Sequence, residues 1–199
     1  MKVVGLGGMP GTGKTTVMLE FLKITDDWKP VKATKLLDAL YSESLDTYVL
    51  GKYSPYHAVD GVFQGTDKLA MNVQPEAISW FKSIKSNVVF EGDRLFTNGI
   101  LMTALEVADD CQFYLLETNT NTLAQRYEDR GSDQSDKFIS GRKTKYENIA
   151  SDRIIEPYVK VLENTKPEDA VMISDEMKAF LSRTDITVRD KAPSIEDFF

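Results

Sequence analysis

An α/β domain is the fold class that the sequence predicts, with a mostly parallel sheet of about five strands and helices on both faces. Short apolar runs alternate along the chain with segments of helical apolar spacing, a pattern typical of parallel strands joined by helices. The first run and the first helical segment flank a glycine-rich loop at residues 8–15. The 199 residues, 42% of them hydrophobic, suffice for one substantial core, so we expect one domain over residues 1–183.

The loop at residues 8–15 has the G-x-x-x-x-G-K-[ST] spacing of a phosphate-binding P-loop. An apolar run at 1–6 precedes it and helical spacing at 15–22 follows it, which is the structural context that the motif requires. The glycines let backbone N–H groups turn toward a polyphosphate, and the helix adds its positive N-terminal end. We expect Lys14 to reach the β- and γ-phosphates of ATP and the Thr15 hydroxyl to bind Mg²⁺. The residues expected to contact ATP are Gly8, Gly11, Thr12, Gly13, Lys14, Thr15 and Thr16.

The segments after the first helix are predicted to be mainly extended or irregular. Residues 25–30 predict a turn, because the final proline restricts the residue before it and the aspartates favour local hydrogen bonds. Apolar and aromatic runs at 36–41 and 47–53 predict two strands joined by a short connection. Residues 54–72 lack a sustained period and are rich in polar groups, which indicates a loop.

Helices and strands alternate in the rest of the chain. The predicted helices cover residues 74–84, 98–108, 119–129, 156–162 and 176–181. The predicted strands cover residues 88–90, 112–116 and 170–173. The helix at 156–162 is expected to begin after the segment 131–145, and residues 184–199 are expected to form an extended or mobile tail.

The net charge of −7 disfavours a protein that grips nucleic acid over a long footprint, because such binding needs clustered Lys and Arg. Positive charge is nevertheless concentrated between Arg126 and Arg153, so a local basic groove stays open. The single cysteine, Cys111, excludes an intramolecular disulfide and is expected to be a core residue at the start of a strand. No apolar run approaches the length of a membrane span, and Met1 leads straight into the first strand. We therefore expect a cytoplasmic protein with no membrane partner.

Two acidic residues, Glu91 and Asp93, follow the predicted strand at 88–90. Ligands of a parallel sheet lie beyond the carboxyl ends of its strands, so these carboxylates are expected beside the phosphates as candidate Mg²⁺ ligands. One of them can organise the waters of Mg²⁺ and the other can accept a proton from a substrate hydroxyl, and we favour Asp93 as that base. The alternative makes Asp93 a cap for the helix near Thr97 and Glu91 a partner of Arg94.

Arg126 and Arg130 lie four residues apart on a predicted helix and share a face, which costs stability unless an anion or a carboxylate lies between them. A glycine-containing stretch and then a basic run with Arg142 follow, which predicts a small lid over residues 131–145. Its closure over ATP would bring Arg126, Arg130 and Arg142 to the developing charge as catalytic groups beside Lys14. The alternative is a solvated surface helix whose arginines pair with neighbouring acidic residues.

The chain resembles the P-loop nucleoside and nucleotide kinase group. The likeness rests on the N-terminal P-loop, on VVFEGDR at 88–94 and on L-x-x-R-x-x-x-R at 123–130, and it covers most of residues 1–182. It implies a three-layer P-loop NTPase fold, ATP and Mg²⁺ as cofactors, and an acceptor site between the second strand and the acidic strand end. By that likeness Glu91 and Asp93 match the acidic Walker-B-like position, whereas the three arginines match lid arginines only loosely.

The acceptor is predicted from the polar loop at 54–72, whose side chains can stack on a base and hydrogen-bond to it. The candidate acceptor-binding residues are Tyr53, Gln64, Thr66, Asp67, Lys68 and Arg94. We therefore expect a kinase that phosphorylates a nucleoside or nucleotide. The segments at 65–68 and 134–145 also resemble those of virus-encoded kinases that act on modified pyrimidines in DNA, so DNA is an alternative partner. A partner-stimulated ATPase is the further alternative, although consecutive Walker-B acids are absent from the acidic strand end.

Overall fold

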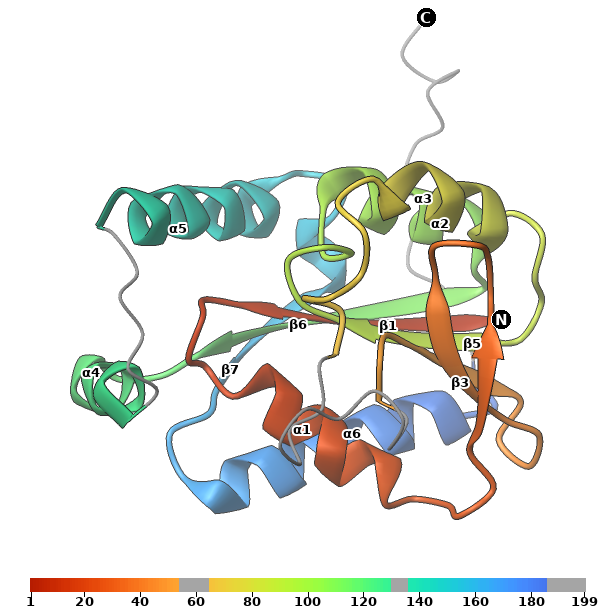
Figure 1. Ribbon diagram of the computed structural model, residues 1–199, viewed down its shortest axis with the longest axis horizontal. Coiled ribbons are helices and arrows are strands. Elements are labelled where there is room, and N and C mark those ends of the chain that lie inside the picture. Colours follow the sequence, from red (N-terminus) through yellow and green to blue (C-terminus); the bar gives the residue numbers. More distant parts are fainter. Residues whose placement is uncertain (54–64, 130–135, 186–199) are drawn as a thin grey trace, which may run out of the picture.

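The structure is a computed structural model that describes residues 1–53, 65–129 and 136–185. Its centre is a seven-stranded sheet with the strand order β2-β3-β4-β5-β1-β6-β7. Helices α2, α3 and α5 cover one face of this sheet and α1 and α6 cover the other, which gives the three layers seen in Figure 1. The predicted α/β fold with helices on both faces is confirmed.

Five neighbouring strands of the sheet are parallel to one another. They are β4 (Thr47–Leu50), β5 (Asn87–Glu91), β1 (Lys2–Gly8), β6 (Asp110–Glu117) and β7 (Val159–Glu163). All residues of β1 are buried, as expected for a central strand with helices over both faces. In the register Leu6 pairs with Glu91 of β5, so the carboxyl ends of these two strands lie side by side.

An antiparallel hairpin extends the sheet beyond the predicted five strands. It consists of β2 (Lys29–Lys32) and β3 (Asp38–Ser42), and β3 also pairs antiparallel with β4. The predicted pair of strands at 36–41 and 47–53 is therefore confirmed, whereas the predicted turn at 25–30 overlaps β2. Pro30 fits within β2 because the strand lies at the edge of the sheet, where a missing N–H is tolerated.

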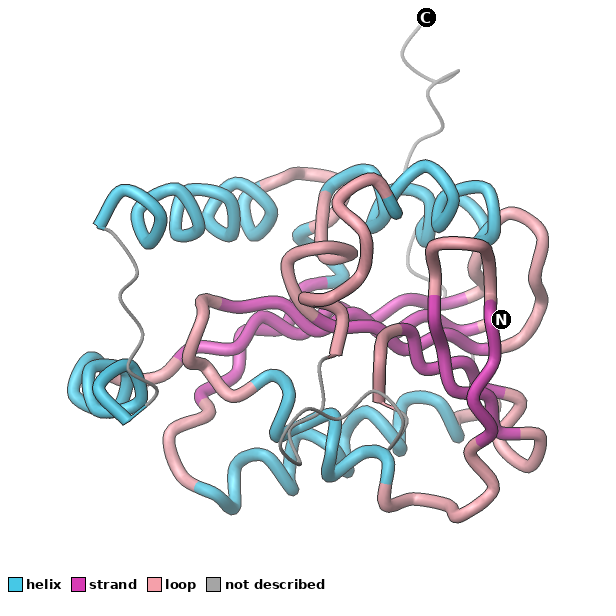
Figure 2. The backbone as a smooth tube through the Cα atoms, in the orientation of Figure 1, coloured by secondary structure: helices cyan, strands magenta, loops and turns pink. Residues whose placement is uncertain are grey.

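The described residues form six α-helices, and Figure 2 shows the helices on the two faces of the sheet. They are α1 (Lys14–Leu22), α2 (Val73–Phe81), α3 (Asn98–Val107), α4 (Thr120–Asp129), α5 (Asp136–Ser151) and α6 (Pro167–Ser182). The predicted helices at 74–84, 98–108 and 119–129 agree with α2, α3 and α4. No helix in the described parts of the chain has both the length and the apolar character needed to cross a membrane.

Two predictions near the C-terminus are wrong. The segment 156–162 is a short 3₁₀ turn, η2 (Glu156–Tyr158), followed by strand β7 rather than a helix. The segment 170–173 is part of α6, whose residues Ala170, Ile173 and Met177 are buried at helical spacing. Both errors concern short apolar runs, which periodicity alone does not assign to helix or strand.

The buried side chains form two clusters, one on each face of the sheet. The larger cluster joins the sheet to α2, α3 and α5, and the other joins it to α1 and α6. Cys111 is buried near the start of β6 and forms no disulfide, as predicted. Of the predicted lid at 131–145, residues 136–145 belong to α5, whereas 131–135 lie outside the described residues together with 186–199 of the predicted tail.

Candidate active site

The P-loop connects the buried end of β1 to the first turn of α1. Gly11 and Gly13 both have a φ of 83°, a left-handed conformation that side chains other than glycine rarely adopt. The loop is closed on itself, since the Thr12 hydroxyl donates to the Met9 carbonyl at 2.8 Å. The Val17 N–H donates to the Gly13 carbonyl at the start of α1. The N–H groups of the first turn of a helix have no partner within the helix and are available to a ligand. This geometry is that of an anion-binding helix N-terminus.

Lys14 lies across this loop rather than in the core. Its Nζ atom donates to the carbonyls of Gly8 at 2.7 Å and Met9 at 3.0 Å. The ammonium group is therefore held inside the cradle by backbone oxygens, the kind of ligand that phosphate oxygens can replace. Among the other predicted ATP contacts, Thr12 is buried, Thr15 is half-buried and Thr16 is exposed.

Side chains from α4 and from the connection between β7 and α6 brace the outside of the P-loop. Arg126 of α4 donates from Nη1 to the Gly11 carbonyl at 2.9 Å, and Tyr127 donates to the Pro10 carbonyl at 2.9 Å. Asn164, directly after β7, donates from Nδ2 to the Thr12 carbonyl at 2.7 Å. The sequence predicts that lid closure brings Arg126 to the developing charge, and in the structure Arg126 contacts the backbone of the P-loop.

Glu91 ends β5 and is buried, with 3% of its surface exposed. The Tyr53 hydroxyl donates to its Oε1 atom at 2.9 Å, and the Thr66 hydroxyl donates to its backbone carbonyl at 2.6 Å. Burial raises the pKa of the Glu91 carboxyl, although the charge of Lys14 acts in the opposite direction. The carboxylate at this strand end is thus within the electrostatic reach of the P-loop lysine.

Asp93 lies two residues further on and has a different environment. Arg142, Lys145 and Tyr146 of α5 converge on it, with Arg142 Nε 3.2 Å from Oδ2 and Lys145 Nζ 3.1 Å from Oδ1. The Tyr146 hydroxyl donates to Oδ1 at 2.6 Å. Although burial by itself raises it, the pKa of Asp93 is held below its ordinary value by Tyr146 and by the charges of Lys145 and Arg142.

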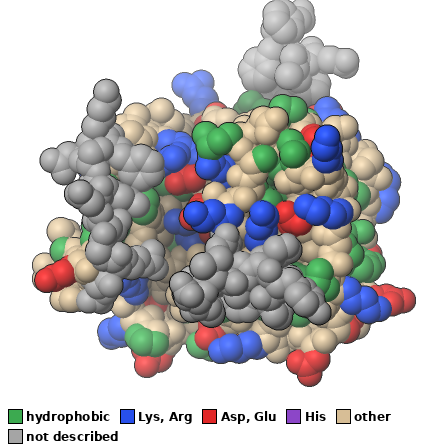
Figure 3. All heavy atoms as spheres, viewed as in Figure 1, with side chains coloured by type: hydrophobic (Ala, Val, Ile, Leu, Met, Phe, Trp, Pro, Cys, Tyr) green, Lys and Arg blue, Asp and Glu red, His purple; other side chains and the backbone are tan. Residues whose placement is uncertain are grey.

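Charged groups from several elements act on Lys145, which pairs with Asp93. Burial lowers the pKa of Lys145, the Asp93 charge opposes this effect, and the charges of Arg142 and Lys14 lower the pKa further. Helix α5 therefore brings two cations toward the lysine of the P-loop. The side chains in Figure 3 show Lys and Arg gathered across the middle of this view, interspersed with acidic groups.

The structure does not agree with the alternative roles for Glu91 and Asp93, a pairing with Arg94 and a helix cap. Thr97 is the residue before α3, and the N-terminus of this helix has no side-chain cap, so Asp93 does not cap it. Glu91 is bonded to Tyr53 rather than to Arg94. Arg142 does pair with a carboxylate, as the surface-helix alternative proposes, but that carboxylate is the functional candidate Asp93.

The predicted acceptor-binding residues fall into two groups. Tyr53 and Thr66 are buried against Glu91, whereas Asp67 and Lys68 are exposed and Arg94 is half-buried. Gln64, like Arg130 among the predicted catalytic residues, lies outside the described residues. The structure thus brings Tyr53 and Thr66 to the acidic strand end, and it leaves their role toward an acceptor as a prediction.

The residues at the strand ends fit a Mg²⁺ ion that is held together with nucleotide phosphates. Across the described ranges no three His, Cys, Asp or Glu side chains gather into a metal site of their own. Such a cage is not required, because Mg²⁺ is usually held by one or two carboxylates and by substrate phosphates. Glu91 and the Thr15 hydroxyl suit this arrangement, whereas both Asp93 oxygens already contact cations or a hydroxyl donor.

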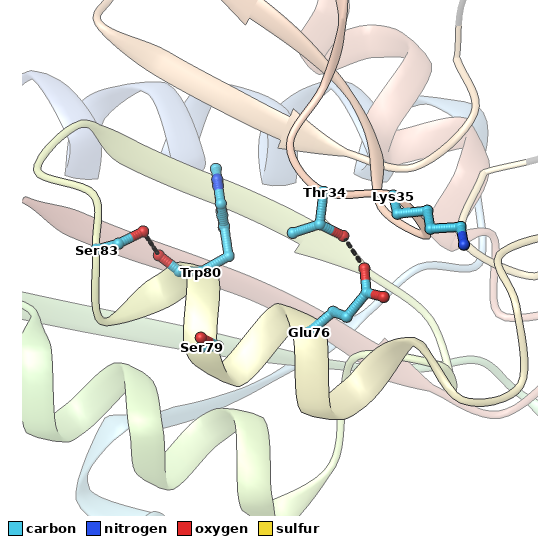
Figure 4. A pocket seen from close by; sticks show the side chains of 6 residues that line it. All are labelled: Thr34, Lys35, Glu76, Ser79, Trp80 and Ser83. Carbon is cyan, nitrogen blue, oxygen red and sulfur yellow. Dashed lines mark hydrogen bonds between the residues drawn. The ribbon is translucent and has the colours of Figure 1, made fainter.

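A separate hollow of about 440 Å³ lies between α2 and the turn before β3. Its lining residues are Thr34, Lys35, Glu76, Ser79, Trp80 and Ser83, drawn in Figure 4. The Glu76 carboxylate accepts hydrogen bonds from the Thr34 hydroxyl and, at 3.0 Å, from the Leu36 N–H. None of the predicted site residues lines this hollow.

Sequence reasoning did not identify Tyr127, Lys145, Tyr146 or Asn164 as parts of the site. A signal existed for Asn164, which is a polar residue at the carboxyl end of a parallel strand, but it required β7 to be recognised as a strand. Lys145 belongs to the basic run noted in the sequence. Nothing in the sequence pattern distinguishes Tyr127 or Tyr146 from core or surface aromatics.

Comparisons with known proteins give a family for the chain and a similar fold. A family model described as P-loop Nucleotide Kinase3 matches residues 1–180, and no curated protein matches the chain. The fold is similar to that of a sugar kinase from Janibacter sp. HTCC2649, with 12% sequence identity, a TM-score of 0.50 and coverage of 90% of this chain and 95% of that one. A gluconokinase from Sinorhizobium meliloti 1021 has 14% identity and a TM-score of 0.47, with coverage of 92% of this chain and 98% of that one.

The two structural similarities concern the fold alone, because the sequence identities are low. Neither the family description nor these two structures names a viral kinase or a modified pyrimidine, so that part of the resemblance stays a prediction. The family match spans the P-loop, both strand-end carboxylates and nearly all of α6. The chain therefore belongs to the P-loop Nucleotide Kinase3 family and is a P-loop phosphotransferase.

Proposed function

We propose that the protein transfers the γ-phosphate of ATP to a hydroxyl of a nucleoside or nucleotide with the help of Mg²⁺. The observation that carries this proposal is the juxtaposition of the P-loop after β1 with the acidic end of β5. The Leu6–Glu91 register puts the two strand ends side by side, and the charge of Lys14 acts on Glu91. The phosphoryl donor and the acidic groups then meet at the carboxyl ends of β1 and β5, as phosphoryl transfer requires.

The P-loop binds and orients the donor in this proposal. Backbone N–H groups of the loop and of the first turn of α1 surround the phosphates, and Lys14 moves from the Gly8 and Met9 carbonyls to phosphate oxygens. The Thr15 hydroxyl and Glu91 hold Mg²⁺ or its waters. When bound, the ion neutralises charge that develops on the phosphates.

Asp93 orients the acceptor hydroxyl and receives its proton. Its low pKa makes it a weak base, but the transition state of phosphoryl transfer is loose and needs little proton removal before the phosphorus–oxygen bond forms. Positioning is then the larger part of its contribution. Lys145 and Arg142 keep the carboxylate ionised and supply positive charge beside it.

The cations around Asp93 support an acceptor that carries phosphate. Lys145 and Arg142 contact Asp93 directly, and Arg94 follows it in the chain. A neutral sugar would not need this charge, whereas a mononucleotide would place its phosphate there. The family to which the chain belongs is also described as a nucleotide kinase family.

A second candidate acceptor is a hydroxymethylated pyrimidine base in DNA. The same basic side chains favour it, because a DNA backbone presents phosphates on both sides of the modified base. The net charge of −7 favours a free mononucleotide over the polymer.

The acceptor is tested by incubating the protein with γ-labelled ATP, Mg²⁺ and one of two acceptor pools. One pool contains free nucleosides and nucleotides, and the other contains DNA with hydroxymethylated pyrimidines. Label in the nucleosides and nucleotides supports the proposal. Label only in the DNA would show that the acceptor is the hydroxymethylated pyrimidine instead. Release of labelled inorganic phosphate without a labelled acceptor would contradict both and favour the partner-stimulated ATPase.

A further inference from the structure

We infer that Tyr53 is a positioning residue that fixes the Glu91 carboxylate toward the metal–nucleotide site. The inference rests on the proposed function, because it assigns Tyr53 a role through Glu91 in holding Mg²⁺. It also differs from the base contact that the sequence predicts for Tyr53. The contact in question is a buried hydroxyl-to-carboxylate hydrogen bond of 2.9 Å between β5 and the segment after β4.

Burial makes this hydrogen bond directional and persistent. Tyr53 is 2% exposed and Glu91 is 3% exposed, so water does not compete for either group. The Tyr53 hydroxyl donates directly to one oxygen of the Glu91 carboxylate. A carboxylate held at one oxygen by a rigid aromatic ring keeps its other oxygen in a fixed direction, which is how outer partners orient metal ligands.

Two glycines, Gly51 and Gly65, leave space for the contact between Tyr53 and Glu91. A Cβ atom on Gly65 would lie 2.6 Å from Glu91 Oε1 and 3.3 Å from the Tyr53 hydroxyl, and one on Gly51 would lie 2.8 Å from the Tyr53 ring. Gly51 and Gly65 have φ angles of 126° and 53°. The Lys52 N–H donates to the Gly65 carbonyl at 2.7 Å and ties the two glycine segments together. Two left-handed glycines at this contact indicate a site built for close approach rather than an incidental packing of Tyr53.

The main chain of Glu91 is fixed as well. The Thr66 hydroxyl donates to the Glu91 carbonyl at 2.6 Å, and a Cβ atom on Gly92 would lie 2.6 Å from that hydroxyl. The charges of Lys14 and Asp67 both act on the Glu91 carboxyl, the first lowering its pKa and the second raising it. Tyr53 and Thr66 therefore hold the carboxylate within reach of the P-loop lysine, where a phosphate-bound ion would sit.

The test uses Mn²⁺ as the probe, with β,γ-imido-ATP as the nucleotide, and measures bound Mn²⁺ by electron paramagnetic resonance. Tyr53→Phe should weaken Mn²⁺ binding to the protein–nucleotide complex by about tenfold, as expected when an outer partner of a metal ligand is lost. Binding of the nucleotide in EDTA should not change, because the P-loop is untouched. In turnover, kcat should fall while the KM for the acceptor stays the same.

Tyr41→Phe is the matched control. Tyr41 also donates to a carboxylate, Asp46 Oδ1 at 3.0 Å. This pair is exposed and joins β3 to the turn before β4. The control variant should bind Mn²⁺ like the wild type. In a Glu91→Ala background, Tyr53→Phe should cause no further loss, because the two residues act as a unit.

A folded Tyr53→Phe protein with wild-type Mn²⁺ affinity would overturn the inference, and so would a raised KM for the acceptor with unchanged Mn²⁺ binding. If Tyr53→Phe does not fold, Thr66→Val serves in its place. It removes the hydrogen bond to the Glu91 carbonyl and must then weaken Mn²⁺ binding. A wild-type protein that binds the Mn²⁺–nucleotide complex but transfers no phosphate would instead contradict the proposed function.

Discussion

Glu91 and Asp93 are two carboxylates at the end of one strand, yet they lie in opposite surroundings. Glu91 is buried, is held by the neutral hydroxyl of Tyr53, and has a pKa raised by burial. Asp93 is partly open to solvent, is held by two cations and a hydroxyl from α5, and has a pKa lowered by those partners. The difference teaches that sequence position brings both groups to the end of β5, beside the strand that leads into the P-loop, whereas their neighbours determine what each can do.

Lys14→Ala should have the largest effect, because Lys14 is the P-loop cation whose charge acts on Glu91 and which is proposed to bind the phosphates. Phosphoryl transfer should fall by well over tenfold, since a factor of ten corresponds to about 1.4 kcal/mol and a phosphate contact contributes more. The rate of label transfer from ATP measures the loss, and circular dichroism checks that the fold is intact. A variant that keeps more than a tenth of the activity would remove Lys14 from the site.

Asp93→Asn should come next and should separate the two carboxylates. It leaves Arg142 and Lys145 beside a neutral amide and removes the group that orients the acceptor, so kcat should fall by about a hundredfold or more. Mn²⁺ binding to the nucleotide complex should remain, in contrast to the Tyr53→Phe and Glu91→Ala variants.

The control for that variant is Asp175→Asn, which neutralises an exposed aspartate paired with Lys178 on α6. Its turnover should match the wild type. If Asp93→Asn instead abolished Mn²⁺ binding and left turnover by bound enzyme intact, the roles of the two carboxylates would have to be exchanged.

Arg142→Gln should have a smaller effect on the same carboxylate. A hydrogen bond to a charged group contributes roughly 1.5–3 kcal/mol, so loss of the Arg142 contact should reduce kcat by about tenfold while Lys145 and Tyr146 still hold Asp93. Lys143→Gln, one residue along α5, removes an exposed cation that pairs with Glu147 and should change nothing. Equal loss in both variants would point to general charge rather than to the Asp93 contact.

The sequence predicts the central fold because each of its signals is local. The P-loop, the buried strand before it and the regular helices α2, α3 and α4 all follow from spacing within a few residues. The errors arise where tertiary contacts decide. Edge strand β2 tolerates Pro30, β7 is a strand because it pairs with β6, and residues 170–173 are helical because one face of α6 packs on the sheet.

The sequence predicts which residues lie at the candidate site, but not which side chains contact one another there. The strand-end position of Glu91 and Asp93 follows from the parallel-sheet rule. That Tyr53 holds the first and Tyr146 the second depends on side chains distant in sequence, Tyr146 being 53 residues from Asp93. No pattern in a single sequence encodes such a pairing, and the same limit applies to Arg126 against the Gly11 carbonyl.

The smallest expected effect is on stability, where the two carboxylates should depend on pH with opposite signs. Asp93 has a lowered pKa, so its contribution is present above its ordinary value of 3.8 and is lost as the pH falls through its folded value. Glu91 has a raised pKa, so its contribution is present below its ordinary value of 4.5 and is lost as the pH rises through its folded value.

Urea unfolding of the wild type, Asp93→Asn and Glu91→Gln across pH 3 to 8 measures these contributions as differences from the wild type. The advantage of the wild type over Asp93→Asn should shrink toward acid pH, and its advantage over Glu91→Gln should shrink toward neutral pH. Parallel curves for the two variants would mean that the surroundings of the two carboxylates do not differ as the contacts indicate.

Acceptor-dependent consumption of ATP tests the central claim most directly. The rate of ADP formation is measured with Mg²⁺ and ATP alone, and then with the nucleoside and nucleotide pool added. A phosphotransferase that orients its acceptor through Asp93 should form ADP at a substantial rate only with the pool present, in a one-to-one ratio with phosphorylated acceptor. ADP formed equally fast without any acceptor, with inorganic phosphate as the other product, would contradict the proposed nucleotide kinase.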